Sequence, residues 1–292
     1  MDNRHSRSLL PLPHRKSDGS ALQGFNPLHP KTSVTLPPEL MDKILEYVDV
    51  DGRESPNLCA CALVATWWTG PSQRRLFSSV KIHRNNYRRW MSGVVLSGSK
   101  AHLLGYVRSL QYSRCGDYRM RGLLQDSEEY LLALHNLHIL TLEDIRIEYI
   151  GREELHTCFS AFHETLTYLS LDNVATSFSA FVTLVDYFPN LTTLRLRFLN
   201  VERNEGPVPS LSRPLRGKLE LGFDYREAKS PTFVNQFAKL ELEYEELVIE
   251  YSGSSSRGTE TLKRALRIST STVKSLRVTA EIGREQPFIH IY

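Results

Sequence analysis

Three hexapeptides decide the fold of this chain: LHILTL at residues 137–142, LTYLSL at 166–171 and LTTLRL at 191–196. Each has leucine at its first, fourth and sixth positions, and VKSLRV at 273–278 keeps the spacing with valine at both ends. Side chains alternate between the two faces of a β-strand, so the fourth and sixth residues share one face. Each hexapeptide therefore predicts a short strand with one apolar face.

Weaker copies of the pattern extend it into a regular series. They are VRSLQY at 107–112, RGKLEL at 216–221 and YEELVI at 244–249. The central leucines then lie at positions 110, 140, 169, 194, 219, 247 and 276, with gaps of 30, 29, 25, 25, 28 and 29 residues. A nearly constant period in this range is typical of stacked leucine-rich repeats. The sequence therefore predicts an α/β fold in which residues 81–292 form an irregular leucine-rich-repeat solenoid with a parallel β-sheet.

The segments between these strands carry helical patterns and loops. Residues 177–190 place Phe178, Phe181 and Leu184 at helical spacing, with Pro189 ending the helix, and residues 126–136 carry a similar apolar stripe. The proline-rich stretch 201–215 and the Ser/Gly-rich stretch 251–259 are predicted loops, which would contact a ligand if both leave the same side of the sheet.

The repeat also departs from the regular form. The position three residues after the last strand leucine often carries Asn or Cys, but it is Ile145, Val174 and Leu199 in the three best copies. We therefore expect no ladder of buried asparagine side chains and a variable curvature.

Residues 33–80 predict a small cluster of three helices, preceded by a flexible tail over residues 1–32. Pro37 and Pro38 suit the first turn of a helix that places Leu40, Ile44, Tyr47 and Val48 on one face. A second helix is expected from Asn57 through Trp68, and Gly70–Pro71 is expected to separate it from a third that ends near Leu76. So small a cluster has little core of its own and is expected to need a partner.

The motif over residues 35–82 resembles an F-box. Its opening is Leu36, Pro37, Glu39 and Leu40, followed by Ile44–Leu45, Leu63–Val64, Trp68 and Leu76–Phe77. Trp67 is an extra aromatic residue beside the usual tryptophan. The whole chain resembles fungal F-box proteins with irregular leucine-rich repeats. The resemblance implies a non-enzymatic substrate-recognition adaptor of a Skp–cullin–F-box ubiquitin ligase. It also implies that the residues docking the Skp-type adaptor are Leu36, Pro37, Leu40, Ile44, Leu45 and Val64.

Composition sets the wider limits. Of the 292 residues, 41% are hydrophobic and 24% charged, which is typical of a globular protein. No apolar run is long enough for a membrane helix, and the apolar island at Leu9–Leu12 is too short for a signal peptide. The four cysteines fit reduced thiols, so we expect a cytoplasmic or nuclear protein without membrane contact.

Residues 71–121 hold eleven basic side chains and one acid, Asp117. A solvated charged face is the favoured interpretation, because no aromatic recognition motif accompanies the charges, and nucleic acid is an unexpected partner. An acidic or nucleic-acid partner remains an alternative, as does a leucine-rich-repeat scaffold without ligase association.

Catalytic and metal chemistry find little support in the sequence. Cys59 and Cys61 are not spaced for zinc, and His135 and His138 have no third ligand nearby. His156, Cys158 and His163 form the only nucleophile pattern to consider, without a recognisable local signature. No phosphate-binding or dinucleotide-binding glycine motif occurs. We therefore predict no catalytic, cofactor or metal residues, and an unidentified protein substrate as the second partner.

Overall fold

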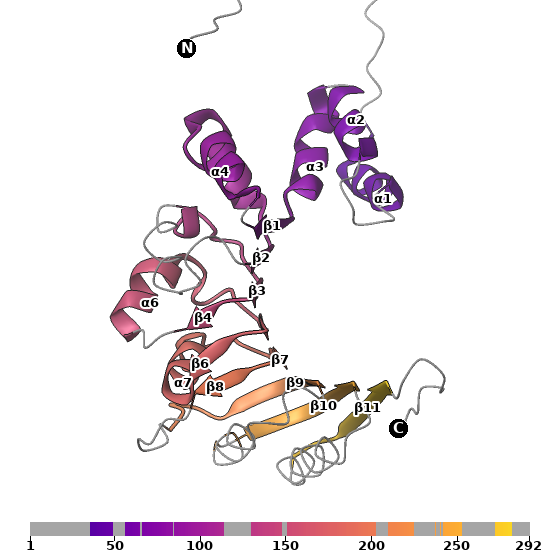
Figure 1. Ribbon diagram of the computed structural model, residues 1–292. Coiled ribbons are helices and arrows are strands. Elements are labelled where there is room, and N and C mark those ends of the chain that lie inside the picture. The colour runs from indigo at the N-terminus through magenta and orange to yellow at the C-terminus, as the bar shows by residue number, and fades with distance from the viewer. Residues whose placement is uncertain are drawn as a thin grey trace, which may run out of the picture. The chain divides into compact units, whose positions relative to one another are not determined.

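The computed structural model describes residues 36–48, 56–64, 66–83, 85–113, 130–147, 151–202, 210–224, 237, 240, 242–252 and 272–281. The tail predicted over residues 1–32, Cys115 and most of the loop predicted at 251–259 lie outside these residues. The helices and strands belong to one unit, Pro38–Tyr292. Its fold is α/β and is built on a parallel sheet (Figure 1).

The main sheet has eight parallel strands within the described residues, and their order in space is their order in the chain. They are β1 (Ser79–His83), β2 (Ser109–Ser113), β3 (Ile139–Glu143), β5 (Tyr168–Asp172), β7 (Thr193–Arg197), β9 (Leu215–Asp224), β10 (Leu242–Ser252) and β11 (Ser275–Glu281). The register aligns the central leucine of each repeat with that of the next, from Leu110 on β2 to Leu276 on β11. The predicted parallel sheet is therefore confirmed, in the register that the repeats imply.

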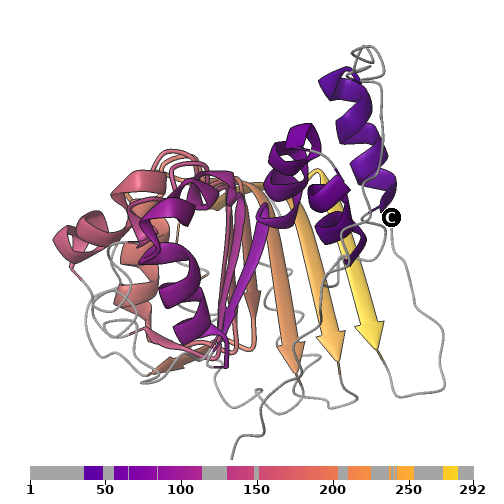
Figure 2. The same ribbon diagram turned by 90° about the horizontal axis from the view of Figure 1, so that it is seen from above.

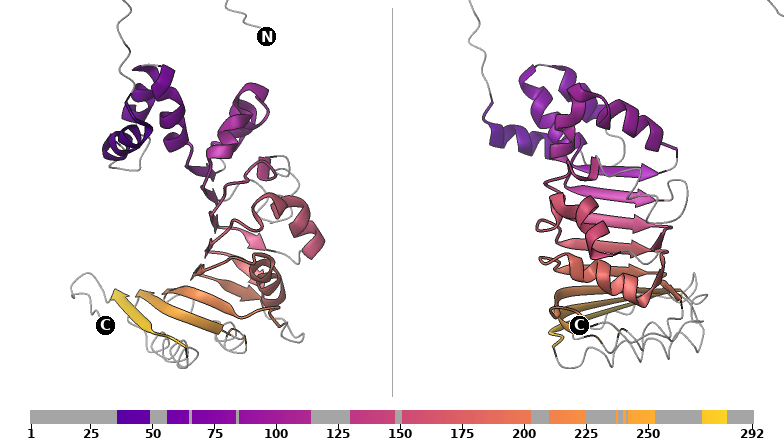
Figure 3. Two further views of the ribbon diagram at one scale, coloured as in Figure 1. Left: turned by 180° about the vertical axis from the view of Figure 1, so that it is seen from behind. Right: turned by 90° about the vertical axis from the view of Figure 1, so that its left-hand side faces the viewer.

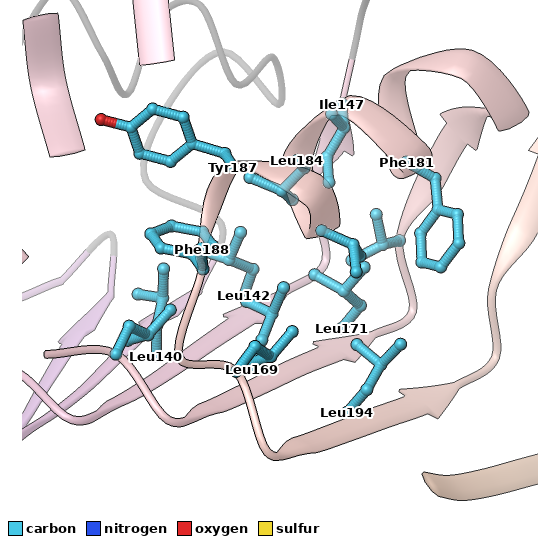
Figure 4. Packing of buried hydrophobic residues seen from close by; sticks show 14 of the residues in the cluster. Leu140, Leu142, Ile147, Leu169, Leu171, Phe181, Leu184, Tyr187, Phe188 and Leu194 are labelled. Carbon is cyan, nitrogen blue, oxygen red and sulfur yellow. The ribbon is translucent and has the colours of Figure 1, made fainter. Parts of the chain in front are cut away.

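The core lies on the side of the sheet to which the repeat leucines point. Leu140, Leu169 and Leu194 are each at most 1% exposed. Helix α7 (Phe178–Tyr187) packs over them, and Figure 4 shows Leu184 and Phe188 facing the strand leucines. The Ser177 side chain accepts a hydrogen bond from the Ala180 amide at 3.2 Å and so caps this helix. The helix predicted in residues 177–190 is thus confirmed.

The remaining helical segments around the sheet are short. They are α4 (Tyr87–Trp90), the π-helical η1 (Met91–Val95), the 3-10 helix η2 (Gly98–Tyr106), α6 (Arg152–Phe159) and the 3-10 helix η3 (Ser160–Phe162). Helices α4, α6 and α7 lie on the same side of the sheet (Figures 2 and 3). The opposite side, called the outer face below, carries the alternate residues of each strand.

A second, smaller sheet lies at the positions where regular repeats often carry an asparagine ladder and where we expected none. Its strands are β4 (Arg146–Ile147), β6 (Ala175–Ser177) and β8 (Asn200–Glu202), and they are parallel. Before each strand, Asp144, Asn173 and Phe198 adopt positive φ angles of 55°, 52° and 52°. Ile145 and Val174 are buried, so hydrocarbon and backbone hydrogen bonds fill this layer.

The segment before β9 is tied to helix α7. The Ser212 amide and hydroxyl both donate to Asp186 Oδ1, at 2.8 and 2.5 Å. The Arg213 guanidinium donates to the carbonyls of Phe188 and Pro189, which end that helix. Burial lowers the pKa of Arg213, and the charge of Asp186 opposes the change. The second half of the loop predicted at 201–215 is therefore held against the helix.

One asparagine bonds to part of the β1 edge that pairs with no other strand among the described residues. Asn86 Nδ2 donates to the Lys81 carbonyl at 2.7 Å, and Asn86 Oδ1 accepts from the His83 amide at 2.8 Å. The Asn86 amide also donates to the His83 carbonyl at 3.0 Å. A further strand would pair with these same backbone groups, so Asn86 satisfies hydrogen-bonding groups that would otherwise be open at this edge.

Candidate functional site

Helix α1 (Pro38–Val48) carries an exposed apolar stripe. Proline at the first position costs no hydrogen bond, and Glu39 in the first turn suits the helix dipole. Leu40, Ile44 and Tyr47 are 48%, 39% and 81% exposed, at spacings of four and three residues. On the other side of the helix Met41 and Leu45 are at most 5% exposed. The helix is therefore apolar on both sides, with one side available to a partner.

Helix α2 (Pro56–Val64) adds two more exposed apolar side chains at its end. Leu63 and Val64 are 86% and 73% exposed, whereas Leu58 is buried. Helix α2 packs against α3 (Thr66–Leu76), and the Thr69 hydroxyl donates to the Ala62 carbonyl at 3.0 Å. We call the five exposed residues the apolar helix surface: Leu40, Ile44, Tyr47, Leu63 and Val64. Large exposed apolar side chains on adjoining helices, as α1 and α2 are, are typical of protein contact surfaces.

The break between the second and third helices differs from the prediction. Helix α2 ends at Val64 and α3 runs through Gly70–Pro71, so Trp68 lies on α3. A residue before proline normally avoids the helical conformation because its Cβ meets the proline ring. Gly70 has no Cβ, which removes that part of the conflict.

The six residues predicted to dock an adaptor fall into three groups. Leu40, Ile44 and Val64 belong to the apolar helix surface, and Leu36 and Pro37 precede α1. Leu45 is 1% exposed and stabilises the helix cluster from inside. Sequence reasoning left Tyr47 and Leu63 out of the docking set. The helical spacing placed Tyr47 on the face of Leu40 and Ile44, but the docking set follows the F-box motif, which does not include Tyr47.

A second candidate feature is a charged network on the outer face of β5 to β10. Arg195 reaches Glu220 on β9 at 3.4 Å and Glu250 on β10 at 3.3 Å. Arg197 Nη1 lies 3.5 Å from Asp172 Oδ2 on β5, and Arg197 Nε lies 3.5 Å from Glu250 Oε2. Each pair is partly exposed and contributes a fraction of a kcal/mol, but together they join four strands.

A glycine makes this reach possible. In the sheet Arg197 pairs with Gly222, which in turn pairs with Glu250. A Cβ on Gly222 would lie 2.7 Å from Cγ of Arg197, so the arginine crosses the strand over bare backbone. The sequence pattern RGKLEL ends at residue 221, so it gave no prediction for Gly222.

The network shifts two pKa values. Burial raises the pKa of the Asp172 carboxyl above its ordinary value, although Arg197 opposes the rise. Burial alone would lower the pKa of Arg195, but a hydrogen bond with Tyr168 and the charge of Glu250 outweigh it and raise the pKa. These groups present a polar surface on the outer face of the sheet.

The histidine and cysteine pattern forms a different contact. His156 Nδ1 lies 3.2 Å from the Tyr187 hydroxyl, and the His163 ring stands edge-on to Tyr187 at 4.7 Å between ring centres. Cys158 is 4% exposed on α6. Burial raises the pKa of Tyr187, so the hydroxyl stays protonated and can donate a hydrogen bond to His156. His156 is thus engaged with a tyrosine in this structure.

No family model and no curated protein matches this sequence. The resemblance to F-box proteins therefore stays an expectation drawn from the motif. Across the described ranges, no three His, Cys, Asp or Glu side chains lie together so as to hold a metal ion. In the same ranges, no helix has the length and apolar character to cross a membrane.

Proposed function

We propose that this protein is an adaptor of the F-box type, in which helices α1–α3 dock a Skp-type protein of a cullin–RING ubiquitin ligase. In this proposal the repeats form an irregular leucine-rich-repeat solenoid that binds a protein substrate. The observation that carries the proposal is the apolar helix surface. Eight large hydrophobic residues are exposed in the described part of the chain, and five of them lie between Leu40 and Val64.

The energetic reason for docking is the burial of this surface. Covering a large apolar side chain contributes about 1.5–3 kcal/mol relative to leaving it exposed. Covering Leu40, Ile44 and Tyr47, which are exposed to water, therefore lowers the free energy of the complex with a partner. Met41, Leu45 and Leu58 are buried in the helices, so a partner would meet a surface that is already formed.

The test is co-purification of the full chain with a Skp-type adaptor. The double variant Leu40→Asp with Ile44→Asp places two charges on the apolar helix surface and is expected to abolish capture. The matched control is Leu96→Asp, because Leu96 is 65% exposed and lies in the turn after η1, away from α1 and α2. The control is expected to bind like the unaltered chain.

Two outcomes would count against the proposal. Capture of the double variant at the unaltered level would remove the docking role of α1. Failure of the unaltered chain to bind any Skp-type adaptor would favour the alternative, a repeat scaffold that binds protein through the outer face without ligase association. The charged network of Arg195 and Arg197 on that face is the observation that supports a protein-binding scaffold.

A further inference from the structure

The outer face of β3 and β5 is apolar where the two strands begin. Ile139 pairs with Tyr168 in the register of the sheet, so the two residues are direct neighbours on adjacent strands. Ile139 is 38% exposed and Tyr168 is half-buried, whereas Leu140, on the core side, is 1% exposed. Among the described residues, the other exposed large hydrophobic side chains lie outside the strands. Ile139 is therefore an exception on a sheet face that is otherwise polar.

A hydrogen bond fixes the direction of the Tyr168 side chain. It joins Tyr168 to Arg195 on the next strand, β7. Glu220 and Glu250 in turn hold the Arg195 guanidinium at 3.4 and 3.3 Å. The tyrosine side chain thus extends across the outer face toward β7. A surface that is already ordered before binding loses less conformational entropy when a partner covers it.

The same two strands end in carboxylates. Glu143 pairs with Asp172 in the register, and the Asp144 amide donates to the Asp172 carbonyl at 3.0 Å. Burial is the main cause of the raised pKa of Asp172, and the charges of Glu143 and Asp144 add to the rise against the effect of Arg197. The three carboxylates are therefore close enough to repel one another.

Two of these carboxylates are bonded to neutral amides. Gln111 Nε2 donates to Glu143 Oε2 at 2.8 Å, and Asn173 Nδ2 donates to Asp144 Oδ1 at 2.5 Å. Neither carboxylate forms an ion pair within the described residues. A cation on a partner would supply the charge that these amides lack.

The charges along the rest of the outer face do not balance this end. The outward-facing positions aligned with Ile139–Glu143, from β3 to β10, hold five carboxylates and three cations. Each of the three cations already lies within 4.0 Å of carboxylates. The outer face therefore complements a positively charged partner. The carboxylates are Glu143, Asp172, Glu220, Glu246 and Glu250, and the cations are Arg195, Arg197 and Lys218.

The strand fixes the distance between the apolar and the acidic ends. A β-strand rises about 3.3 Å per residue, so the backbone positions of Ile139 and Glu143 are about 13 Å apart. An extended segment laid along β3 has the same rise, and its residues four positions apart face the same side. One such segment can therefore contact both ends at once.

We propose that the outer face of β3 and β5 binds an extended segment of another protein that carries a large apolar side chain and, four positions away, a lysine or arginine. The inference rests on the part of the proposed function in which the repeats bind a protein substrate, and it names the chemistry of the bound segment. The apolar side chain covers Ile139 and Tyr168, and the basic group pairs with Glu143 and Asp144. A glutamate or aspartate at the basic position is disfavoured by repulsion between like charges.

The experiment measures binding of fluorescent peptides to the full chain by anisotropy. Each peptide has one leucine and one arginine in a background of serine and glycine, separated by two, four or six positions. The peptide with four-position separation is expected to bind most tightly. Exchange of its arginine for glutamate should weaken binding about tenfold, because attraction is lost and repulsion is added.

Two variants test the two ends of the surface. Glu143→Lys is expected to weaken the arginine peptide about tenfold and to strengthen the glutamate peptide by a similar factor, an exchange of preference that misfolding cannot produce. Ile139→Ser is expected to weaken the leucine peptide about fivefold and to leave a peptide with serine in place of leucine unchanged.

Matched controls make the same changes elsewhere. Glu153→Lys reverses an exposed charge on α6, which lies on the other side of the sheet (Figure 1). Leu132→Ser removes a leucine that is 37% exposed in the turn before β3. Both controls should leave binding of the leucine–arginine peptide within about twofold of the unaltered chain.

Several results would overturn the inference. They are binding that does not depend on the leucine–arginine separation, undiminished binding by both Glu143→Lys and Ile139→Ser, equal losses in the controls, and no binding of any peptide in the set. The Leu40/Ile44 variant should bind the peptide normally, and Glu143→Lys should still capture the Skp-type adaptor. A chain that captures the adaptor but no peptide refutes this inference alone, and one that binds the peptide but no adaptor refutes the docking role alone.

Discussion

Gly217 is the position at which a single methyl group is expected to do the most damage to the sheet. It immediately precedes Lys218, where the pairing of β9 with β7 begins, and it has a φ of 90°, which favours glycine. A Cβ at this position would lie 2.2 Å from the backbone oxygen of Thr192. That oxygen also accepts the Lys218 amide at 2.8 Å, so the neighbouring strand cannot move away without losing the bond.

The cost of Gly217→Ala follows from these contacts. A left-handed φ costs a residue with a side chain about 1–2 kcal/mol. Separation of the strands at Thr192 removes a hydrogen bond of about 1 kcal/mol and leaves its groups poorly paired. The sum, about 2–3 kcal/mol, is a large fraction of the 5–15 kcal/mol that is typical of a folded protein. For a chain of this size it corresponds to a fall in Tm of about 4–12 °C.

Thermal unfolding followed by far-ultraviolet circular dichroism measures this directly. The control is Gly93→Ala, because a Cβ at Gly93 meets nothing within 4 Å and the residue lies in the helical segment η1. Its Tm should be unchanged or slightly raised. A Gly217→Ala protein that unfolds within about 1 °C of the unaltered chain would refute the close approach of β7 and β9 described above.

Three further changes test other layers of the structure. Leu169→Ala, at a position with no exposed surface, should lower the free energy of unfolding in urea by about 2–5 kcal/mol, whereas Ile139→Ala on the outer face should cost under about 1 kcal/mol. Ser177→Ala removes the cap of α7 and should cost about 1 kcal/mol in the same measurement. Tyr244→Phe should be neutral or stabilising at pH 7, because the buried Tyr244 hydroxyl has no hydrogen-bond partner among the residues that the structure describes. Burial raises the pKa of Tyr244, so the folded state disfavours its ionisation. Stability should therefore fall as pH rises above about 10, and Tyr244→Phe should reduce this loss in urea titrations at pH 9 to 11.

The sequence predicts the main sheet because each strand repeats the same constraint. A leucine at the fourth position, such as Leu140 or Leu219, must face the core, and a slip of one residue would turn it to the outer face. Even the weak copy at Tyr244 lies in the expected register, although an extra residue bulges at that end of β10. The end of α7 could also be predicted from the sequence, because Pro189 ends the helix through a local effect on the residue before it.

Other features depend on contacts that a single chain segment cannot reveal. The roles of Gly217 and Gly222 come from Thr192 and Arg197 on a neighbouring strand. The small second sheet arises from backbone pairing, which the pattern of side chains in the sequence hardly reveals. In the candidate site, the exposure of Leu40 and Ile44 agrees with the stripe seen in the sequence, but the burial of Leu45 is set by packing between helices. The docking role of these residues remains a prediction.

The side-chain amide of Asn86 has a consequence for the edge of the parallel sheet at β1. Any array of parallel strands can in principle be lengthened, either by a duplicated repeat or by a strand from a neighbouring molecule, and both additions use the same backbone groups. At the β1 end those groups at Lys81 and His83 are occupied by one side chain. Loss of that amide would expose these backbone groups to pairing with a strand of another molecule. A substitution at Asn86 should therefore increase self-association of the protein at high concentration.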